Sequence, residues 1–206
     1  MRSKPGRPPT FTESARREQF VACAIEAISE IGYPQLSIRK VAERAGVAMS
    51  VVLYHFGSKD NLVDAIVETM CRSALALVGP AVDAETTAAG KLGAYIRATL
   101  EYFDTHRGQL AALAQIGTSH RPGGERGPGL PSETREQLAA LDPKPILLDG
   151  QRNGEFGDFP ADSVAIALRG AVNASVEKIL AETDFDPRAY GEDVAQIFGR
   201  FLGSAL

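Results

Sequence analysis

The sequence has few of the residues on which metal, disulfide or catalytic chemistry commonly depends. Its 206 residues include two cysteines, Cys23 and Cys71, and three widely separated histidines, His55, His106 and His120. Both cysteines fall in apolar helical stretches, so we expect reduced core thiols and no disulfide. The motifs GxxxxGK[ST], GxGxxG and HExxH are missing, and no nucleophile has an evident base nearby. We therefore expect no metal, no cofactor and no enzymatic activity.

Long apolar segments are missing as well. No run of about 18 apolar residues occurs, so no transmembrane helix is expected. The N-terminal segment MRSKPGRPPT is basic, but it is not followed by the apolar stretch of a secretory signal. We expect a cytoplasmic protein without a membrane partner.

Charge is distributed unevenly along the chain, whose net charge is −4. Residues 1–60 hold nine of the 22 Lys and Arg and six of the 26 Asp and Glu, a net charge of +3, whereas the remainder carries −7. A basic front on an acidic body suggests that the front meets a polyanion. Apolar residues make up 44% of the chain, enough to form a hydrophobic core.

Apolar residues recur at helical spacing along most of the chain, and no segment alternates as a half-buried strand does. The first helix should follow Thr10 or Thr12 as N-cap and end at Gly32. Further helices are expected at about 37–45, 48–55, 59–78, 86–105, 108–118, 132–141, 144–153, 161–183 and 187–204. Gly79-Pro80 should end the helix that begins at residue 59, and the Gly- and Pro-rich segment 121–131 should be a loop. The predicted fold class is all-α.

The segment 36–56 carries the clearest functional pattern. It reads LSIRKVAERAGVAMSVVLYHF, in which a helix, a tight glycine turn and a second short helix follow one another. Gly46 permits the positive φ of a sharp turn, and the small Ala42 lets the two helices approach closely. This spacing is typical of a helix-turn-helix, whose second helix enters the major groove of DNA.

Residues 32–66 resemble the TetR family of transcriptional regulators. The residues that carry the resemblance are Leu36, Val41, Ala42, Ala45, Gly46, Val47, Tyr54, His55, Phe56, Ser58, Lys59, Asp60 and Leu62. The resemblance implies a three-helix DNA-binding domain with a basic arm in residues 1–58. It also implies a larger helical domain for ligand sensing and dimerisation in residues 59–206.

The family's DNA contacts carry over position by position. Arg39 would reach DNA from the first helix of the motif, Tyr54 and His55 would touch the phosphate backbone, and Lys59 would bind a phosphate at a helix N-terminus. The exposed face of the recognition helix would comprise Met49, Ser50, Val51 and Leu53. For each of these positions the alternative is an ordinary core or surface residue, and Val47, Val52 and Phe56 are expected in the core.

Two positions depart from the family, which commonly has threonine in place of Val51 and tyrosine in place of Leu53. Both changes remove a hydroxyl group, so base reading would depend more on apolar contact with thymine methyls. In the arm, Arg2, Lys4 and Arg7 would reach a groove or the phosphates, or else remain a free tail.

The helical body should dimerise and bind an effector. Apolar residues at helical spacing in the last two helices predict a four-helix interface between two chains at about 161–204, with an intrachain core as the alternative. These residues are Ala165, Leu168, Val172, Val176, Ile179, Val194, Ile197, Phe198, Phe201 and Leu202. A ligand pocket is predicted around Met70, Tyr95, Tyr102, Phe103, Leu113 and Ile116, with a filled core as the alternative.

The function expected from the sequence is that of a ligand-responsive repressor. It would bind a palindromic double-stranded operator as a homodimer and be released by a small apolar effector. One alternative is a constitutive DNA-binding regulator or activator without a ligand. Another is a small-molecule-binding enzyme on a helical scaffold, which salt-dependent binding to duplex DNA would distinguish from the regulators.

Overall fold

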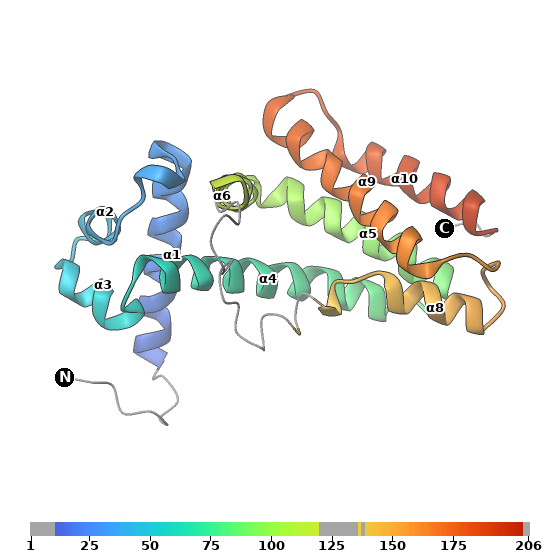
Figure 1. Ribbon diagram of the computed structural model, residues 1–206, viewed down its shortest axis with the longest axis horizontal. Coiled ribbons are helices and arrows are strands. Elements are labelled where there is room, and N and C mark those ends of the chain that lie inside the picture. Colours follow the sequence, from blue (N-terminus) through green and yellow to red (C-terminus); the bar gives the residue numbers. More distant parts are fainter. Residues whose placement is uncertain (1–10, 120–135, 137–138, 204–206) are drawn as a thin grey trace. The chain divides into compact units, whose positions relative to one another are not determined.

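The computed structural model describes residues 11–119, 136 and 139–203. Regular structure in these residues is helical, as the all-α prediction required (Figure 1). The helices are α1 (Phe11–Ile31), α2 (Ile38–Arg44), α3 (Met49–Phe56), α4 (Lys59–Asp83), α5 (Ala88–Thr105), α6 (Arg107–Ser119), α8 (Lys144–Arg152), α9 (Ala161–Ala181) and α10 (Pro187–Leu202). A short 3-10 helix, η1 (Tyr33–Gln35), follows α1. The basic arm, the Thr10 cap, the predicted loop 121–131 and most of the predicted helix 132–141 lie outside the described residues.

The chain divides into two compact units. The first comprises Met1–Thr69 and Ala111–Gly129, and the second comprises Met70–Leu110 and Leu130–Leu206. The division falls within α4 and within α6, not at residue 58. The predicted boundary at residue 58 separates two functional roles, and it stays a prediction.

The first unit is built around the apolar face of α1. Phe20, Ala24 and Ile28 of α1 are fully buried, and so are Val41 of α2 and Val52 of α3. Two residues of the first part of α4, Leu62 and Ile66, are also fully buried. Burial of this apolar surface, worth about 25 cal/mol per Å², holds the two short helices α2 and α3 in place, since helices of this length are marginal alone.

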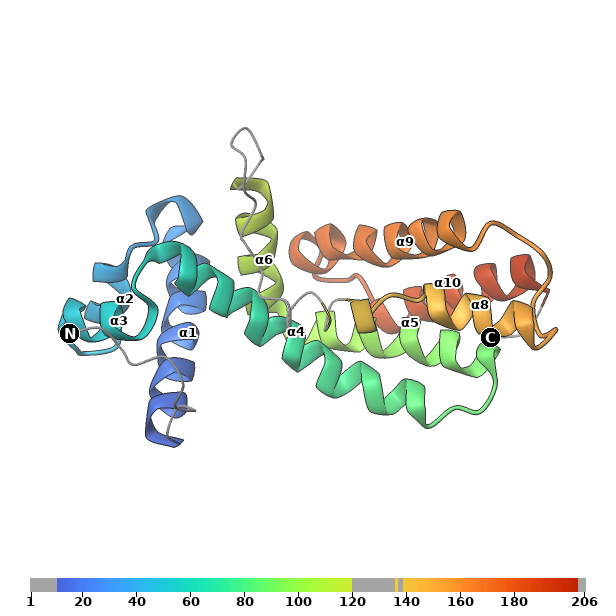
Figure 2. The same ribbon diagram turned by 60° about the horizontal axis from the view of Figure 1, so that its bottom comes forward.

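In the second unit, α5 contacts each of α8, α9 and α10. The two views in Figures 1 and 2 both show α9 and α10 running alongside α5. The core contains Leu92 and Ile96 of α5, Leu147 of α8, Leu168 of α9 and Leu202 of α10. Searched over the described residues, no helix is long and apolar enough to cross a membrane.

Most helix ends follow the local signals in the sequence, but one prediction is wrong. The Gly79-Pro80 pair does not end the helix that begins at Lys59, because α4 continues through Pro80 to Asp83. Pro80 removes one backbone donor near the end of the helix, and the Ala84 N–H still bonds to the Pro80 carbonyl at 3.1 Å. Both Ala76, about one turn before, and Pro80 are exposed, so water can reach this side of the helix. The preceding Gly79 has no Cβ to clash with the proline ring.

Candidate nucleic-acid interface

The motif of α2, a tight turn and α3 is formed as the sequence predicted. The Ser37 hydroxyl caps α2 by accepting the Lys40 N–H at 3.3 Å. Gly46 has a φ of 67°, and after it the Val47 N–H donates to the Ala42 carbonyl at 3.0 Å. This bond closes the turn over α2 and sets the direction in which α3 begins.

Packing determines which face of α3 is free. Val52 and Phe56 are buried, so the opposite face cannot turn inward without exposing them. That opposite face carries Met49, Ser50, Val51 and Tyr54, which are all exposed. Leu53 was predicted to lie on the same face but is only partly exposed. Val47, predicted in the core, is likewise only partly buried. The free face is thus short and mainly apolar, with hydroxyl groups on Ser50 and Tyr54.

The C-terminal end of α3 is held by Arg17 of α1. Its guanidinium donates to the His55 carbonyl at 3.0 Å and lies 4.5 Å above the centre of the Phe56 ring. The His55 ring packs edge-on against Phe20 at 5.4 Å between centroids. Burial, followed by the charge of Arg17, lowers the pKa of His55 from its ordinary value. Arg17 therefore positions the end of the helix that bears Tyr54 and His55, a role that no local sequence pattern indicates.

Lys59 lies at the start of α4, where Ser58 caps the helix by accepting the Asn61 N–H at 3.1 Å. The Lys59 ammonium lies 4.5 Å above the Tyr33 ring and donates to the Tyr33 carbonyl at 3.4 Å. An ammonium has three donors, so this arrangement leaves N–H groups for an anion. The positive end of the helix dipole favours an anion at the same place.

Arg39 is exposed on α2 and donates to the Glu43 carboxylate at 2.7 Å. Such an exposed ion pair is weak, so it can yield to a base edge without much loss. The remaining predicted contacts, Arg2, Lys4 and Arg7, lie outside the described residues.

We expect Arg39→Ala to relax the base preference at one position of the bound DNA. The guanidinium fork matches the two acceptors of guanine, and such a pair discriminates against a wrong base on the order of tenfold or more. Competition binding with duplexes substituted one base pair at a time measures this preference. If affinity falls by the same factor for every duplex, Arg39 contacts a phosphate instead.

The residues predicted for the ligand pocket fall in two different units. Met70, Tyr95 and Tyr102 are buried in the second unit and Phe103 is partly buried there, whereas Leu113 and Ile116 belong to the first. Leu113 is 38% exposed. The Tyr102 hydroxyl lies 3.0 Å from the Met70 carbonyl and from the Gln109 amide oxygen. Burial raises the pKa of Tyr102 to about 12, so its hydroxyl stays neutral.

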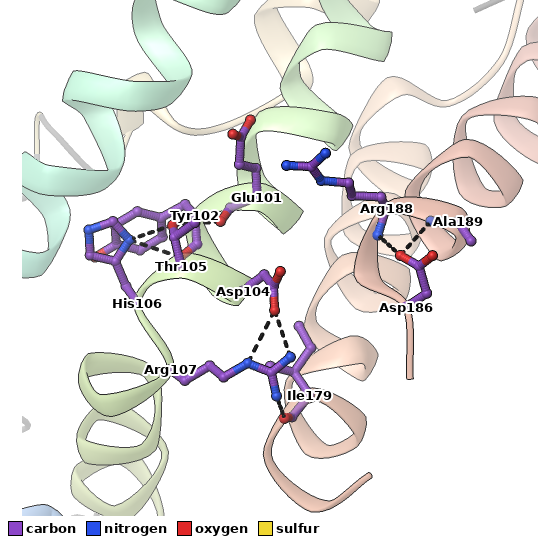
Figure 3. Close-up of polar contacts among 10 residues, drawn as sticks. All are labelled: Glu101, Tyr102, Asp104, Thr105, His106, Arg107, Ile179, Asp186, Arg188 and Ala189. Atoms are coloured by element: carbon purple, nitrogen blue, oxygen red, sulfur yellow. Dashed lines mark hydrogen bonds and ion pairs between the residues drawn. The ribbon is translucent and has the colours of Figure 1, made fainter. Parts of the chain in front are cut away.

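Polar contacts surround this tyrosine at the junction of α5 and α6 (Figure 3). The His106 ring stacks on the Tyr102 ring at 4.4 Å. The Arg107 guanidinium binds Asp104 of α5 and donates to the Ile179 carbonyl of α9 at 2.6 Å. A pocket of about 280 Å³ lies in the second unit, lined by Arg97, Glu101, Pro187, Arg188, Gly191 and Glu192. Four of these six residues of α5 and α10 are charged, and none of them is a predicted pocket residue.

A second candidate surface lies on α9 and α10. Ile166, Ile197 and Phe201 are each 63% exposed, and Leu180 is 40% exposed. Six residues that the sequence suggested for a dimer interface are instead buried in the chain's own core: Ala165, Leu168, Val172, Ile179, Val194 and Leu202. Ile197 and Phe201 were among the predicted residues, whereas Ile166 and Leu180 were not, because α9 is apolar on two sides and its core packing buries one of them. The dimer interface itself stays a prediction.

Comparison with known protein sequences finds similarity in the first unit. Residues 20–66 match the family described as bacterial regulatory proteins, tetR family. The chain is 32% identical over 65 residues to the HTH-type transcriptional regulator BetI of Stenotrophomonas maltophilia, which is 32% of this chain and 33% of that protein. It is 36% identical over 53 residues to BetI of Escherichia coli, 26% of this chain and 27% of the relative. These matches span about a third or less of the curated relatives' length.

Solved structures resemble nearly the whole chain. A putative transcriptional regulator from Pseudomonas aeruginosa PAO1 superposes with a TM-score of 0.77 at 21% identity, over 93% of this chain and 92% of that one. The TetR family regulator PfmR from Thermus thermophilus superposes with a TM-score of 0.66 at 19% identity, over 91% and 96%. The regulator FadR from Bacillus subtilis, solved in complex with stearoyl-CoA, gives 0.70 at 19% identity, over 87% and 96%. At these identities the likeness concerns the fold.

Proposed function

We propose that this chain is a transcriptional regulator of the TetR type that binds a palindromic DNA operator, a proposal supported by the match of residues 20–66 to the tetR family of bacterial regulatory proteins. The observation that carries the proposal is the free face of α3. Met49, Ser50, Val51 and Tyr54 are exposed on a helix whose other face is buried. A helix with one fixed and one free face, at this spacing after α2, suits the major groove.

The charged groups around α3 support the same proposal. Arg39 on α2 and Lys59 at the start of α4 lie on the elements that flank α3 in sequence. Arginine suits a base edge or a phosphate, and the lysine at a helix N-terminus suits a phosphate. Two copies of the helix-turn-helix in a homodimer would bind half-sites about one helical turn, ~34–36 Å, or a small multiple apart.

Ligand control is the finer part of the proposal. We infer a repressor that a small, largely apolar effector releases, bound in the helical body near Tyr95, Tyr102 and Phe103. The buried Tyr102 hydroxyl, with its carbonyl and amide neighbours, is the kind of polar group that fixes the orientation of an apolar ligand. The fold neighbour FadR was solved with stearoyl-CoA, which supports a ligand in a body of this fold.

Selection of bound duplexes from a random DNA library, followed by binding at several salt concentrations, tests the proposed function. The logarithm of affinity should fall linearly with the logarithm of salt concentration, by about 0.9 for each phosphate neutralised. Failure to enrich any sequence, together with no salt-dependent binding to duplex DNA, would sink the proposal.

We expect Lys59→Ala to weaken binding to all duplexes alike. The ammonium neutralises a phosphate and reads no base, so the salt slope should fall by about one unit for each bound protomer. Fluorescence anisotropy with the selected duplex and with a random duplex compares the two losses. A loss confined to the selected duplex, with an unchanged salt slope, contradicts the role given to Lys59.

A further inference from the structure

The turn after α1 is held by two side chains that are distant in sequence. Tyr33 is buried, at 5% exposure, and begins η1 directly after Gly32. Its backbone N–H donates to the side-chain oxygen of Gln115 on α6 at 3.0 Å. Its backbone carbonyl accepts from the Lys59 ammonium at 3.4 Å. Both polar backbone groups of this one residue therefore have side-chain partners, one on α6 and one at the start of α4.

Each partner does something different for the turn. The Gly32 position at the start of η1 provides no side-chain cap, so the Tyr33 N–H depends on an acceptor from elsewhere. Gln115 supplies that acceptor from 82 residues away in the sequence. The turn in its turn positions Lys59, because the Lys59 ammonium lies 4.5 Å from the centre of the Tyr33 ring. The ring's negative face attracts the ammonium and limits the positions that the flexible lysine adopts.

We propose that Gln115 is a positioning residue for DNA binding, which acts on Lys59 through Tyr33. Gln115 fixes the backbone of Tyr33, and Tyr33 fixes the ammonium at the N-terminus of α4. Without the glutamine acceptor, the buried N–H must seek water or another partner, and the turn that carries the ring shifts. The lysine then samples more positions and binds a phosphate less well. This inference rests on the proposed function, in which Lys59 is a phosphate contact.

The three residues belong to the same compact unit, which comprises Met1–Thr69 and Ala111–Gly129. Nothing in the chain's local pattern marks Gln115, which lies in the middle of α6 and is partly buried. A purely structural role would make Gln115 a stabilising cap with no selective effect on phosphate binding. The positioning role and the purely structural role predict different effects of a Gln115 substitution on DNA affinity in a protein that already lacks Lys59.

The test is a double-mutant cycle of Gln115→Met and Lys59→Ala, measured with a fluorescein-labelled duplex of random sequence. Methionine has a similar length but offers no oxygen to the Tyr33 N–H. We expect Q115M to lower affinity by up to roughly fivefold for each bound protomer at 0.15 M salt, the loss of about one phosphate contact in each, and to lower the salt slope. In the Lys59→Ala background the same substitution should change neither quantity.

Gln151→Met is the matched control. The Gln151 side chain also bonds to backbone, donating to the Gly157 carbonyl at 3.2 Å and the Phe159 carbonyl at 3.0 Å, but it belongs to the other unit. Q151M should leave the affinity and salt slope unchanged. If Q115M weakens binding equally with and without Lys59, or leaves the salt slope unchanged, the proposal is overturned. If Lys59→Ala itself leaves binding unchanged, the role of Lys59 in the proposed function fails instead.

Hydrogen exchange in the unsubstituted protein tests the proposal even if a variant fails to fold. The Tyr33 amide should be protected from hydrogen exchange, because its proton is bonded to Gln115. Exchange of this amide at the rate of a free peptide would show that the bond is not maintained and would overturn the proposal.

Discussion

Replacing Ile197 and Phe201 together by glutamate should convert the protein to a monomer and nearly abolish operator binding. Both side chains are 63% exposed on α10, and Ile166 and Leu180 are exposed on α9, which contacts α10. Single exposed apolar residues are ordinary, but an apolar face over two adjacent helices suggests a partner surface. In a two-fold interface each substitution occurs twice, so the double variant would place four carboxylates where apolar contact is expected.

The surface of α9 is suited to close approach of a second copy. Between Ile166 and Leu180 its exposed positions include Ala167, Gly170 and Ala174, whose small side chains let helix axes come near one another. A homodimer through α9 and α10 would thus form a four-helix interface, as the sequence suggested for residues of about 161–204. The exposed residues, and not the buried Leu168 or Val172, would make the contact.

The expected loss of operator affinity follows from the joining of two DNA-binding domains in one dimer. A dimer binds its second half-site as an intramolecular event, and losing that linkage reduces affinity by about 10²–10⁴-fold. Light scattering gives the oligomeric state at micromolar concentration, and anisotropy gives the affinity for the selected duplex. Leu148→Glu is the control, since Leu148 is an exposed apolar residue on α8 at 37% exposure. A double variant that remains dimeric would show that another surface joins the two copies.

The sequence predicted the helices well where local chemistry decides their ends. Ser37 and Ser58 cap α2 and α4, and Asp186 caps α10 just before Pro187 (Figure 3). In each case a short side chain bonds to N–H groups two or three residues further along the chain, so the signal is contained in a few neighbouring letters. The helix end predicted at Pro80 was wrong because a proline near the end of a helix destabilises it less when the preceding residue lacks a Cβ and the turn is exposed to water.

The sequence could not predict contacts that depend on tertiary packing. Arg17 reaches the carbonyl of His55 from 38 residues away, and Gln115 reaches Tyr33 from 82 residues away. Neither residue has a local pattern that separates it from an ordinary helical surface residue. The same limit applies to α9, where apolar spacing alone does not tell which of two apolar faces is covered by α5 and α8.

The Phe156 ring, packed against the end of α8, should make Gly150 difficult to replace. The N–H groups of Glu155 and Phe156 both donate to the Gly150 carbonyl, at 2.9 and 3.1 Å. These bonds bring the chain back over the end of α8 and place the Phe156 ring against Gly150. A Cβ at this position would lie 2.1 Å from a ring carbon of Phe156. Phe156 is 5% exposed and belongs to the core, so its ring has little room to move.

We therefore expect Gly150→Ala to lower the free energy of unfolding by about 1–3 kcal/mol, the usual cost of overpacking a core. The effect must exceed the gain of up to ~1 kcal/mol that alanine brings to a helix interior. Gly93→Ala is the matched control on α5, because the nearest atoms to its Cβ are the guanidinium end of Arg97, a flexible and 40% exposed side chain. Arg97 can move aside, so this variant should be as stable as the parent or slightly more so. Urea unfolding of both variants at one protein concentration measures the difference, because the stability of a protein that dimerises would depend on its concentration. Equal loss in the two variants would mean that a shared effect of alanine, and not the Phe156 ring, limits position 150.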